Sequence, residues 1–170
     1  MPRWNAMNLA RTCRACLTGF AGFALVILPA SLAEATFGPR TVIGANYQQT
    51  STTLSGNGST AGSCNGFSNC FVLFQPAPGQ KALIVQHVSC RVSVDAGAMS
   101  FGLLWIRKGQ DLPFKRVPLL PVPSAGATWI VNSPVMHLIE PGERPLVFLA
   151  GTAAAAWNGE CTISGQLQQP

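Results

Sequence analysis

Residues 82–94 read ALIVQHVSCRVSV, and their alternation decides the fold class. From Val88 to Val94 every second residue is apolar, and the residues between them are serine or arginine. Successive side chains of a β-strand point to opposite faces, so this pattern predicts a strand with one face in a core. Residues 161–168, CTISGQLQ, repeat the pattern near the C-terminus. The chain therefore carries at least two half-buried strands far apart in sequence.

Further short apolar runs follow one another along the chain, separated by turn signals rich in proline, glycine and aspartate. They cover residues 71–74, 82–94, 99–107, 114–120, 128–131, 135–139, 146–150 and 161–168. No stretch of ten or more residues shows the periodicity of a helix. We therefore predict an all-β protein, an antiparallel β-sandwich of jelly-roll type that forms a single domain after a signal peptide. The sequence Glu140-Pro141-Gly142-Glu143 suits a type II turn, which predicts that the runs on either side are neighbouring antiparallel strands.

The N-terminus has the composition of a secretory leader. Three arginines, at positions 3, 11 and 14, precede an uncharged run of 14 residues, 15–28, and Ala33-Glu34-Ala35 offers a cleavage site of small residues. We predict a signal peptide at residues 1–35 and a secreted or periplasmic protein. An uncleaved anchor is the alternative, but a spanning helix needs about 20 apolar residues. A lipid anchor is disfavoured because Cys13 lies before the apolar run and Cys16 at its start, whereas a lipidated cysteine follows such a run. We expect no stable membrane anchor after cleavage.

Four cysteines follow the leader, and an even number in an exported chain predicts disulfides. Cys90 and Cys161 both fall on the apolar face of their predicted strands, so we pair them with each other inside the core. Cys64 and Cys70 then close a small loop. A zinc site needs closely spaced cysteine pairs or histidines, and this spacing does not fit one. We expect neither a metal nor a cofactor.

The part of the chain that follows the leader divides into a polar beginning and a strand-rich body. Residues 36–69 hold one predicted strand, 41–47, and then a segment of mainly Ser, Thr, Gly, Asn and Gln that has too little apolar surface to pack. We predict that this segment is flexible and that residues 70–170 form the sandwich body.

The charge is mild once the leader is removed. Of eleven basic and six acidic residues, eight and five remain, a net charge of +3. Much of the excess is grouped in Arg107, Lys108, Lys115 and Arg116, opposed by Asp111. Such a group can bind anionic polymers, but it is also typical of a solvated hairpin loop, and without a run of five like charges the second interpretation is favoured. We expect no nucleic-acid partner.

Residues 101–106 and 146–150 are apolar on both strand faces. One face of each fills the core, so the other must be covered by the chain's own loops, by a second subunit or by a ligand. Charged residues make up 10% of the chain, against about 25% in typical soluble domains. A homo-oligomer is therefore one expectation, with its contact at these strands.

Catalytic motifs are sparse. The sequence has no nucleophile elbow, and its two histidines, His87 and His137, have no local partner set. We assign no catalytic residue, and an exported hydrolase is only the second alternative. The first alternative is a module that binds carbohydrate or another cell-surface polymer through Trp105, Trp129 and Trp157, of which Trp157 is expected in an exposed loop. The main prediction is an exported, disulfide-bonded β-sandwich with a binding or structural role, whose specific activity the sequence does not reveal.

Overall fold

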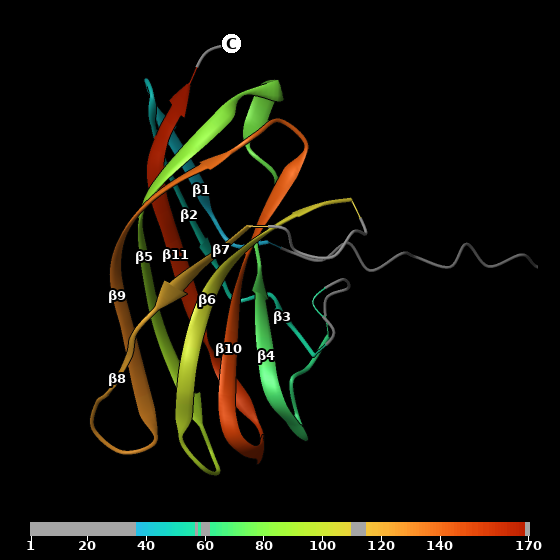
Figure 1. Ribbon diagram of the computed structural model, residues 1–170, viewed down its shortest axis with the longest axis vertical. Coiled ribbons are helices and arrows are strands. Elements are labelled where there is room, and N and C mark those ends of the chain that lie inside the picture. The colour runs from blue at the N-terminus through green and yellow to red at the C-terminus, as the bar shows by residue number, and fades with distance from the viewer. Residues whose placement is uncertain (1–36, 57, 59–61, 110–114, 169–170) are drawn as a thin grey trace, which may run out of the picture. The chain divides into compact units, whose positions relative to one another are not determined.

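The computed structural model describes residues 37–56, 58, 62–109 and 115–168 (Figure 1). All of them belong to one structural unit, Glu34–Pro170. The predicted leader, part of the glycine-rich segment and residues 110–114, which include Asp111, lie outside the described residues.

Two antiparallel sheets pack against each other, as the alternation predicts. The six-stranded sheet has the order β1 (Arg40–Ile43), β2 (Asn46–Ser51), β11 (Trp157–Gln168), β5 (Ala82–Val94), β9 (Thr128–Ile139) and β8 (Pro121–Pro123). The five-stranded sheet has the order β3 (Leu54–Ser55), β4 (Phe67–Leu73), β10 (Glu143–Ala155), β6 (Met99–Lys108) and β7 (Lys115–Leu119). A short 3-10 helix, η1 (Pro78–Gln80), precedes β5.

The order of the longer strands is that of a jelly roll. Among the strands β2, β4, β5, β6, β7, β9, β10 and β11, the first lies beside the last and the second beside the next to last, and only β6 and β7 are consecutive strands of the same sheet. In Figure 1, β2, β11, β5 and β9 form one layer, and β4, β10, β6 and β7 form the other. This winding of two Greek keys confirms the predicted fold class.

The core lies between the sheets and consists of the inward residues of each strand. On β5 these are the alternating residues Leu83, Val85, Val88, Cys90, Val92 and Val94, each no more than 3% exposed. The main core cluster also contains Phe74, Leu104, Ile106, Val131, Ile139, Val147, Leu149 and Ile163. Fully burying each large aliphatic side chain contributes about 1.5–3 kcal/mol, so this cluster is the main source of stability.

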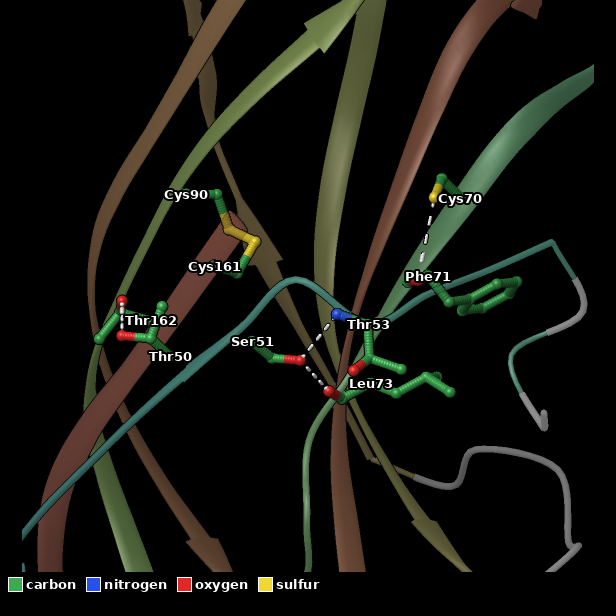
Figure 2. The surroundings of a disulfide bond; sticks show 9 residues. All are labelled: Thr50, Ser51, Thr53, Cys70, Phe71, Leu73, Cys90, Cys161 and Thr162. Carbon is green, nitrogen blue, oxygen red and sulfur yellow. Dashed lines mark hydrogen bonds between the residues drawn. A yellow bond between two sulfur atoms is a disulfide. The ribbon is translucent and has the colours of Figure 1, made fainter. Parts of the chain in front are cut away.

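Both disulfides have the connectivity that the alternation predicts. Cys90 and Cys161 are directly opposite each other on β5 and β11, with their Cα atoms 4.0 Å apart. Figure 2 shows this bridge joining two neighbouring strands of one sheet, with its sulfur atoms on the core side. Cys64 is bonded to Cys70 on β4. Two buried disulfides indicate an oxidising environment.

The prediction of a flexible polar segment after residue 47 is wrong for most of residues 48–55. Residues 48–51 belong to β2, which also contains the last two residues of the predicted strand 41–47 and pairs with β11 in the six-stranded sheet, and residues 54–55 form β3. Their inward side chains are polar but hydrogen-bonded: the Tyr47 hydroxyl donates to Gln49 Oε1 over 2.7 Å, and the Ser51 hydroxyl donates to the carbonyl of Leu73 over 2.6 Å. Hydrogen-bonded polar side chains can line a core without an apolar pattern.

The prediction that residues 135–139 and 146–150 are paired neighbours is also wrong. They lie on β9 and β10, which belong to different sheets. The turn between them exists, because the Glu143 N–H donates to the Glu140 carbonyl and Gly142 has a φ of +81°. The turn therefore carries the chain across the sandwich instead of closing a hairpin. Residues 128–131 and 135–139 are in turn parts of one strand, β9.

Candidate functional site

Four aromatic side chains meet on the outer face of the five-stranded sheet, and we call them the aromatic cluster: Phe71, Phe101, Trp105 and Phe148. Phe148 is at its centre, with its ring centroid 5.0 Å from Phe71, 5.8 Å from Phe101 and 4.7 Å from Trp105. The rings of Phe148 and Trp105 are stacked at 11°. The cluster forms because β4, β10 and β6 are neighbours and their outward positions coincide in register.

One side of the cluster is covered by the chain itself. Leu146, Leu73 and Phe71 form a second small core, 0%, 1% and 8% exposed, and Phe37 packs against it. Gly58 lies so close to the ring of Phe71 that a Cβ at this position would come within 3.0 Å of it. Over β4 and β10, the predicted cover by the chain's own segments is therefore present.

The other side of the cluster, over β6 and β7, is open to solvent. Phe101 is 46% exposed, and Leu120, just after β7, is 77% exposed. Leu103, Trp105 and Phe148 are half-buried. Self-association through this surface stays a prediction, and light scattering that gives the mass of a single chain would contradict it.

An arginine side chain lies on the open side of the aromatic cluster. Arg116 on β7 is directly opposite Trp105 on β6, and its guanidinium carbon lies 5.2 Å from the centroid of the indole ring. A cation over an aromatic face is attracted by the ring quadrupole, a contribution of about 0.5–1 kcal/mol at exposed sites. Trp105 therefore contacts the rings of Phe71 and Phe148 and the guanidinium of Arg116, so its indole does not present a free face.

Two more arginines extend the basic surface. Arg107 on β6 is directly opposite Arg144 on β10, on the same outward face as Trp105. Arg107 also donates to the carbonyl of Gly58 over 2.7 Å. Like charges directly opposite each other on a sheet destabilise it. We use the name arginine group for Arg107, Arg116 and Arg144.

Lys115 differs from these arginines although it is next to Arg116 in sequence. Its ammonium is 3.3 Å from Glu143, whose side chain is 3% exposed, and Glu143 also accepts the N–H of Glu140. A buried carboxylate needs such partners because burial of an unpaired charge is costly. The basic group identified from sequence therefore has two kinds of members. Lys115 pairs with a buried carboxylate, whereas Arg107 and Arg116 lie on the outer face.

The structure also changes the interpretation of the basic group as a plain solvated loop. In the sequence the only aromatic residue between Arg107 and Arg116 is Phe114, whereas pairing of β6 with β7 puts Trp105 beside Arg116. Arg144 is missed by sequence grouping because it is 28 positions beyond Arg116. The only sequence signal for it is its alternation with Leu146 and Phe148 on β10.

The two other tryptophans of the predicted binding set lie elsewhere. Trp129 on β9 is partly buried against the main core. The expectation that Trp157 lies in an exposed loop is wrong: it is the first residue of β11, is 4% exposed and donates its indole N–H to the carbonyl of Phe67 over 2.9 Å. The alanines at 153–155 belong to β10, so only Ala156 separates the two strands.

The histidines are on opposite sides of the six-stranded sheet. His87 is on the outer side, where its Nε2 lies 2.6 Å from Asn132 Oδ1. His137 is half-buried near Lys115 and Glu143. Burial lowers the pKa of His137 and the charge of Lys115 lowers it further, while Glu143 raises it.

The described residues contain no group of three or more His, Cys, Asp or Glu side chains able to hold a metal ion. A membrane-spanning helix is likewise missing from the part of the chain that the structure describes. Comparison with protein-family models, with curated proteins and with solved structures gives no match to this chain.

Proposed function

We propose that this protein is an exported binding module that holds an acidic polysaccharide of a cell surface or extracellular matrix against the outer face of its five-stranded sheet. The observation that carries this proposal is the arginine group beside the aromatic cluster. A guanidinium suits a carboxylate or sulfate because it can donate two parallel hydrogen bonds to it.

Charge complementarity favours an anionic partner. Arg107 and Arg144 are directly opposite on the sheet, and Arg116 is on the next strand. An anion bound beside the arginine group is attracted by all three positive charges. On the other sheet Arg91 is instead directly opposite Glu160, so that arginine has an acidic neighbour.

The length of the surface favours a polymer over a small ligand. Phe101, Leu103, Trp105 and Arg107 follow one another along the outer face of β6. At about 3.3 Å per residue, this line is about 20 Å long. Apolar C–H groups of sugar rings can contact the exposed ring of Phe101, while the acidic substituents reach the arginines.

Export is supported by the leader-like N-terminal sequence and by the two disulfides, which are stable in oxidising compartments. Mass spectrometry of the protein purified from a secreting host tests this part. We expect an N-terminus near Thr36 and no free thiol at Cys90 or Cys161. An intact Met1 would contradict export through cleavage.

Binding is tested by titrating the protein with polygalacturonate and with neutral dextran. We expect polygalacturonate to bind at low ionic strength and to weaken as salt is added, because exposed charges are screened. Dextran should not bind to this face. The double variant Arg116→Gln/Arg144→Gln should bind polygalacturonate about tenfold or more weakly, since each exposed arginine–carboxylate contact contributes on the order of 1 kcal/mol.

Arg91→Gln is the matched control, because it removes the same charge from the outer face of the other sheet. It should leave the affinity within about twofold of the unmodified protein. The proposal is contradicted if polygalacturonate does not bind, if the double variant binds as the unmodified protein does, or if Arg91→Gln causes an equal loss.

A further inference from the structure

A β-bulge interrupts the six-stranded sheet at Gln86. Along β5 and β11, Ser164 is opposite His87 and Gly165 is opposite Val85, so Gln86 has no partner on β11. The pairing of β5 with β9 also skips Gln86. A bulge can change the direction of a side chain, and bulges are over-represented at sheet edges, at barrel rims and next to active sites. Gln86 is exposed on the outer face.

Gly165 makes this bulge possible. A Cβ atom at position 165 would overlap the carbonyl oxygen of Ile84 on the neighbouring strand. Only glycine lets the two backbones approach this closely. The bulge is therefore encoded in the sequence of β11 as well as in β5.

The bulge lies at a hollow of about 330 Å³ on the outer face of the six-stranded sheet. Its lining comes from four neighbouring strands, β1, β2, β11 and β5. The lining residues are Thr41, Ile43, Asn46, Tyr47, Gln48, Gln86, Ser164 and Gly165. We call this hollow the bulge groove.

Polar side chains cross the groove in a row. Thr41 is opposite Gln48, and Gln48 is opposite Ser164, which is in turn beside the bulged Gln86. Neighbouring strands are about 4.8 Å apart, so a row across four strands is about 14 Å long. A ligand in this groove would extend perpendicular to the strands.

The chemistry of the lining is neutral. Asn46, Gln48 and Gln86 each carry an amide that both donates and accepts hydrogen bonds, and Thr41 and Ser164 add hydroxyl groups. None of the lining residues is charged. At the β1 side Ile43 is 71% exposed and offers an apolar contact. Hydroxyl groups on a ring with an apolar C–H face are the ligand chemistry that matches these groups.

We infer that the bulge groove is a second binding site, and that it takes a neutral oligosaccharide. This site is independent of the acidic-polymer surface, because it is on the other sheet and uses no arginine. A protein with both sites can bridge an acidic polymer and a neutral one.

Nuclear magnetic resonance of the isotope-labelled protein tests the inference. The side-chain amide signals of Asn46, Gln48 and Gln86 are followed while maltohexaose, cellohexaose, xylohexaose and chitohexaose are added in turn, each up to millimolar concentration. We expect at least one of these neutral sugars to shift the three signals together in a saturable way.

Gln86→Ala should then weaken binding of that sugar about tenfold, since it removes an amide able to make two hydrogen bonds. Gln168→Ala is the matched control, because it removes the same group from the outer side of β11 outside the groove. Ser164→Ala is a second, smaller probe of the groove, expected to weaken binding a few-fold.

The inference is overturned if none of the four sugars shifts these amide signals, or if Gln86→Ala and Gln168→Ala have the same effect. Polygalacturonate affinity of Gln86→Ala separates the two proposals. It should equal that of the unmodified protein whether or not the groove binds sugar.

Discussion

The outer faces of the two sheets differ although their inner faces are alike. On the outer face of the six-stranded sheet, hydroxyl groups pair across strands, and a positive charge is beside a negative one. The hydroxyls of Thr50 and Thr162 are 2.8 Å apart, those of Ser93 and Thr128 are 3.3 Å apart, and Arg91 is opposite Glu160. The outer face of the five-stranded sheet carries aromatic rings and arginines. Both sheets present aliphatic residues to the shared core.

This comparison separates what determines the fold from what determines recognition. The inward residues drive folding because they remove apolar surface from water. The outward residues are free to vary, so a difference between the outer faces reports what each face contacts. The predictions below test whether the two faces differ in stability and in binding as their composition implies.

The largest expected effect concerns the bridge within the six-stranded sheet. Replacing Cys90 and Cys161 by alanine opens a loop with a sequence separation of 71, whereas replacing Cys64 and Cys70 opens one of 6. In the chain-entropy model these losses are about 4 and about 2 kcal/mol of unfolding free energy. Urea denaturation of the two double variants measures them. Equal losses would show that the bridge between β5 and β11 has no special importance.

The next effect is the pH dependence of the same sheet. Burial raises the pKa of Tyr47 to about 12, while Arg40 lowers it less. The folded protein therefore retains the phenolic proton above pH 10, where the unfolded chain has lost it, and stability falls as pH rises from about 10 to 12. The loss is at most about 3 kcal/mol.

Tyr47 is the only tyrosine of the chain, so its ultraviolet absorbance reports its ionisation directly. Tyr47→Phe is the control, and its unfolding free energy should be less sensitive to pH in this range. An absorbance change centred near pH 10 in the folded protein would contradict the burial of this hydroxyl.

A smaller effect compares one contact on each outer face. Phe148→Ala removes a half-buried ring that contacts three aromatic neighbours, and we expect a loss of about 2 kcal/mol in the unfolding free energy. Thr162→Val removes only the hydrogen bond with Thr50, at about 0.5–1 kcal/mol. Thermal or urea denaturation ranks the two, and the opposite order would mean that the aromatic cluster contributes little to stability.

The smallest effect concerns the orientation of Arg116. Trp105→Leu keeps apolar bulk but removes the ring under the guanidinium. If Trp105 positions Arg116, polygalacturonate affinity should fall about two- to fivefold, matching about 0.5–1 kcal/mol of cation–π attraction. Trp129→Leu, on the other sheet, is the control and should leave the affinity unchanged. Equal affinities of both variants would exclude this role of Trp105.

The fold could be predicted because its long strands alternate. Residues 82–94, identified from sequence, are the observed bounds of β5. Residues 48–51 of β2 were missed because Gln49 and Ser51 face inward with polar side chains, which alternation does not distinguish from a loop. β10 is longer than predicted because Gly151 and Thr152 interrupt its apolar pattern.

The candidate site could be predicted only in part. Sequence alone identifies Trp105, Arg107 and Arg116 and the doubly apolar strands. It cannot show that Arg144 is opposite Arg107, because that contact depends on the register of β6 with β10. The bulge at Gln86 is equally hidden, since it arises from three strands that are far apart in the chain.

The most direct test of the account is a nuclear magnetic resonance titration with polygalacturonate that observes both faces in one sample. We predict shifts of the Nε–H signal of Arg116 and the indole N–H signal of Trp105, with no shift of the Nε–H signal of Arg91 or the backbone amide of Thr162. Shifts confined to Arg91 and Thr162, or equal shifts on both faces, would contradict the assignment of acidic-polymer binding to the five-stranded sheet.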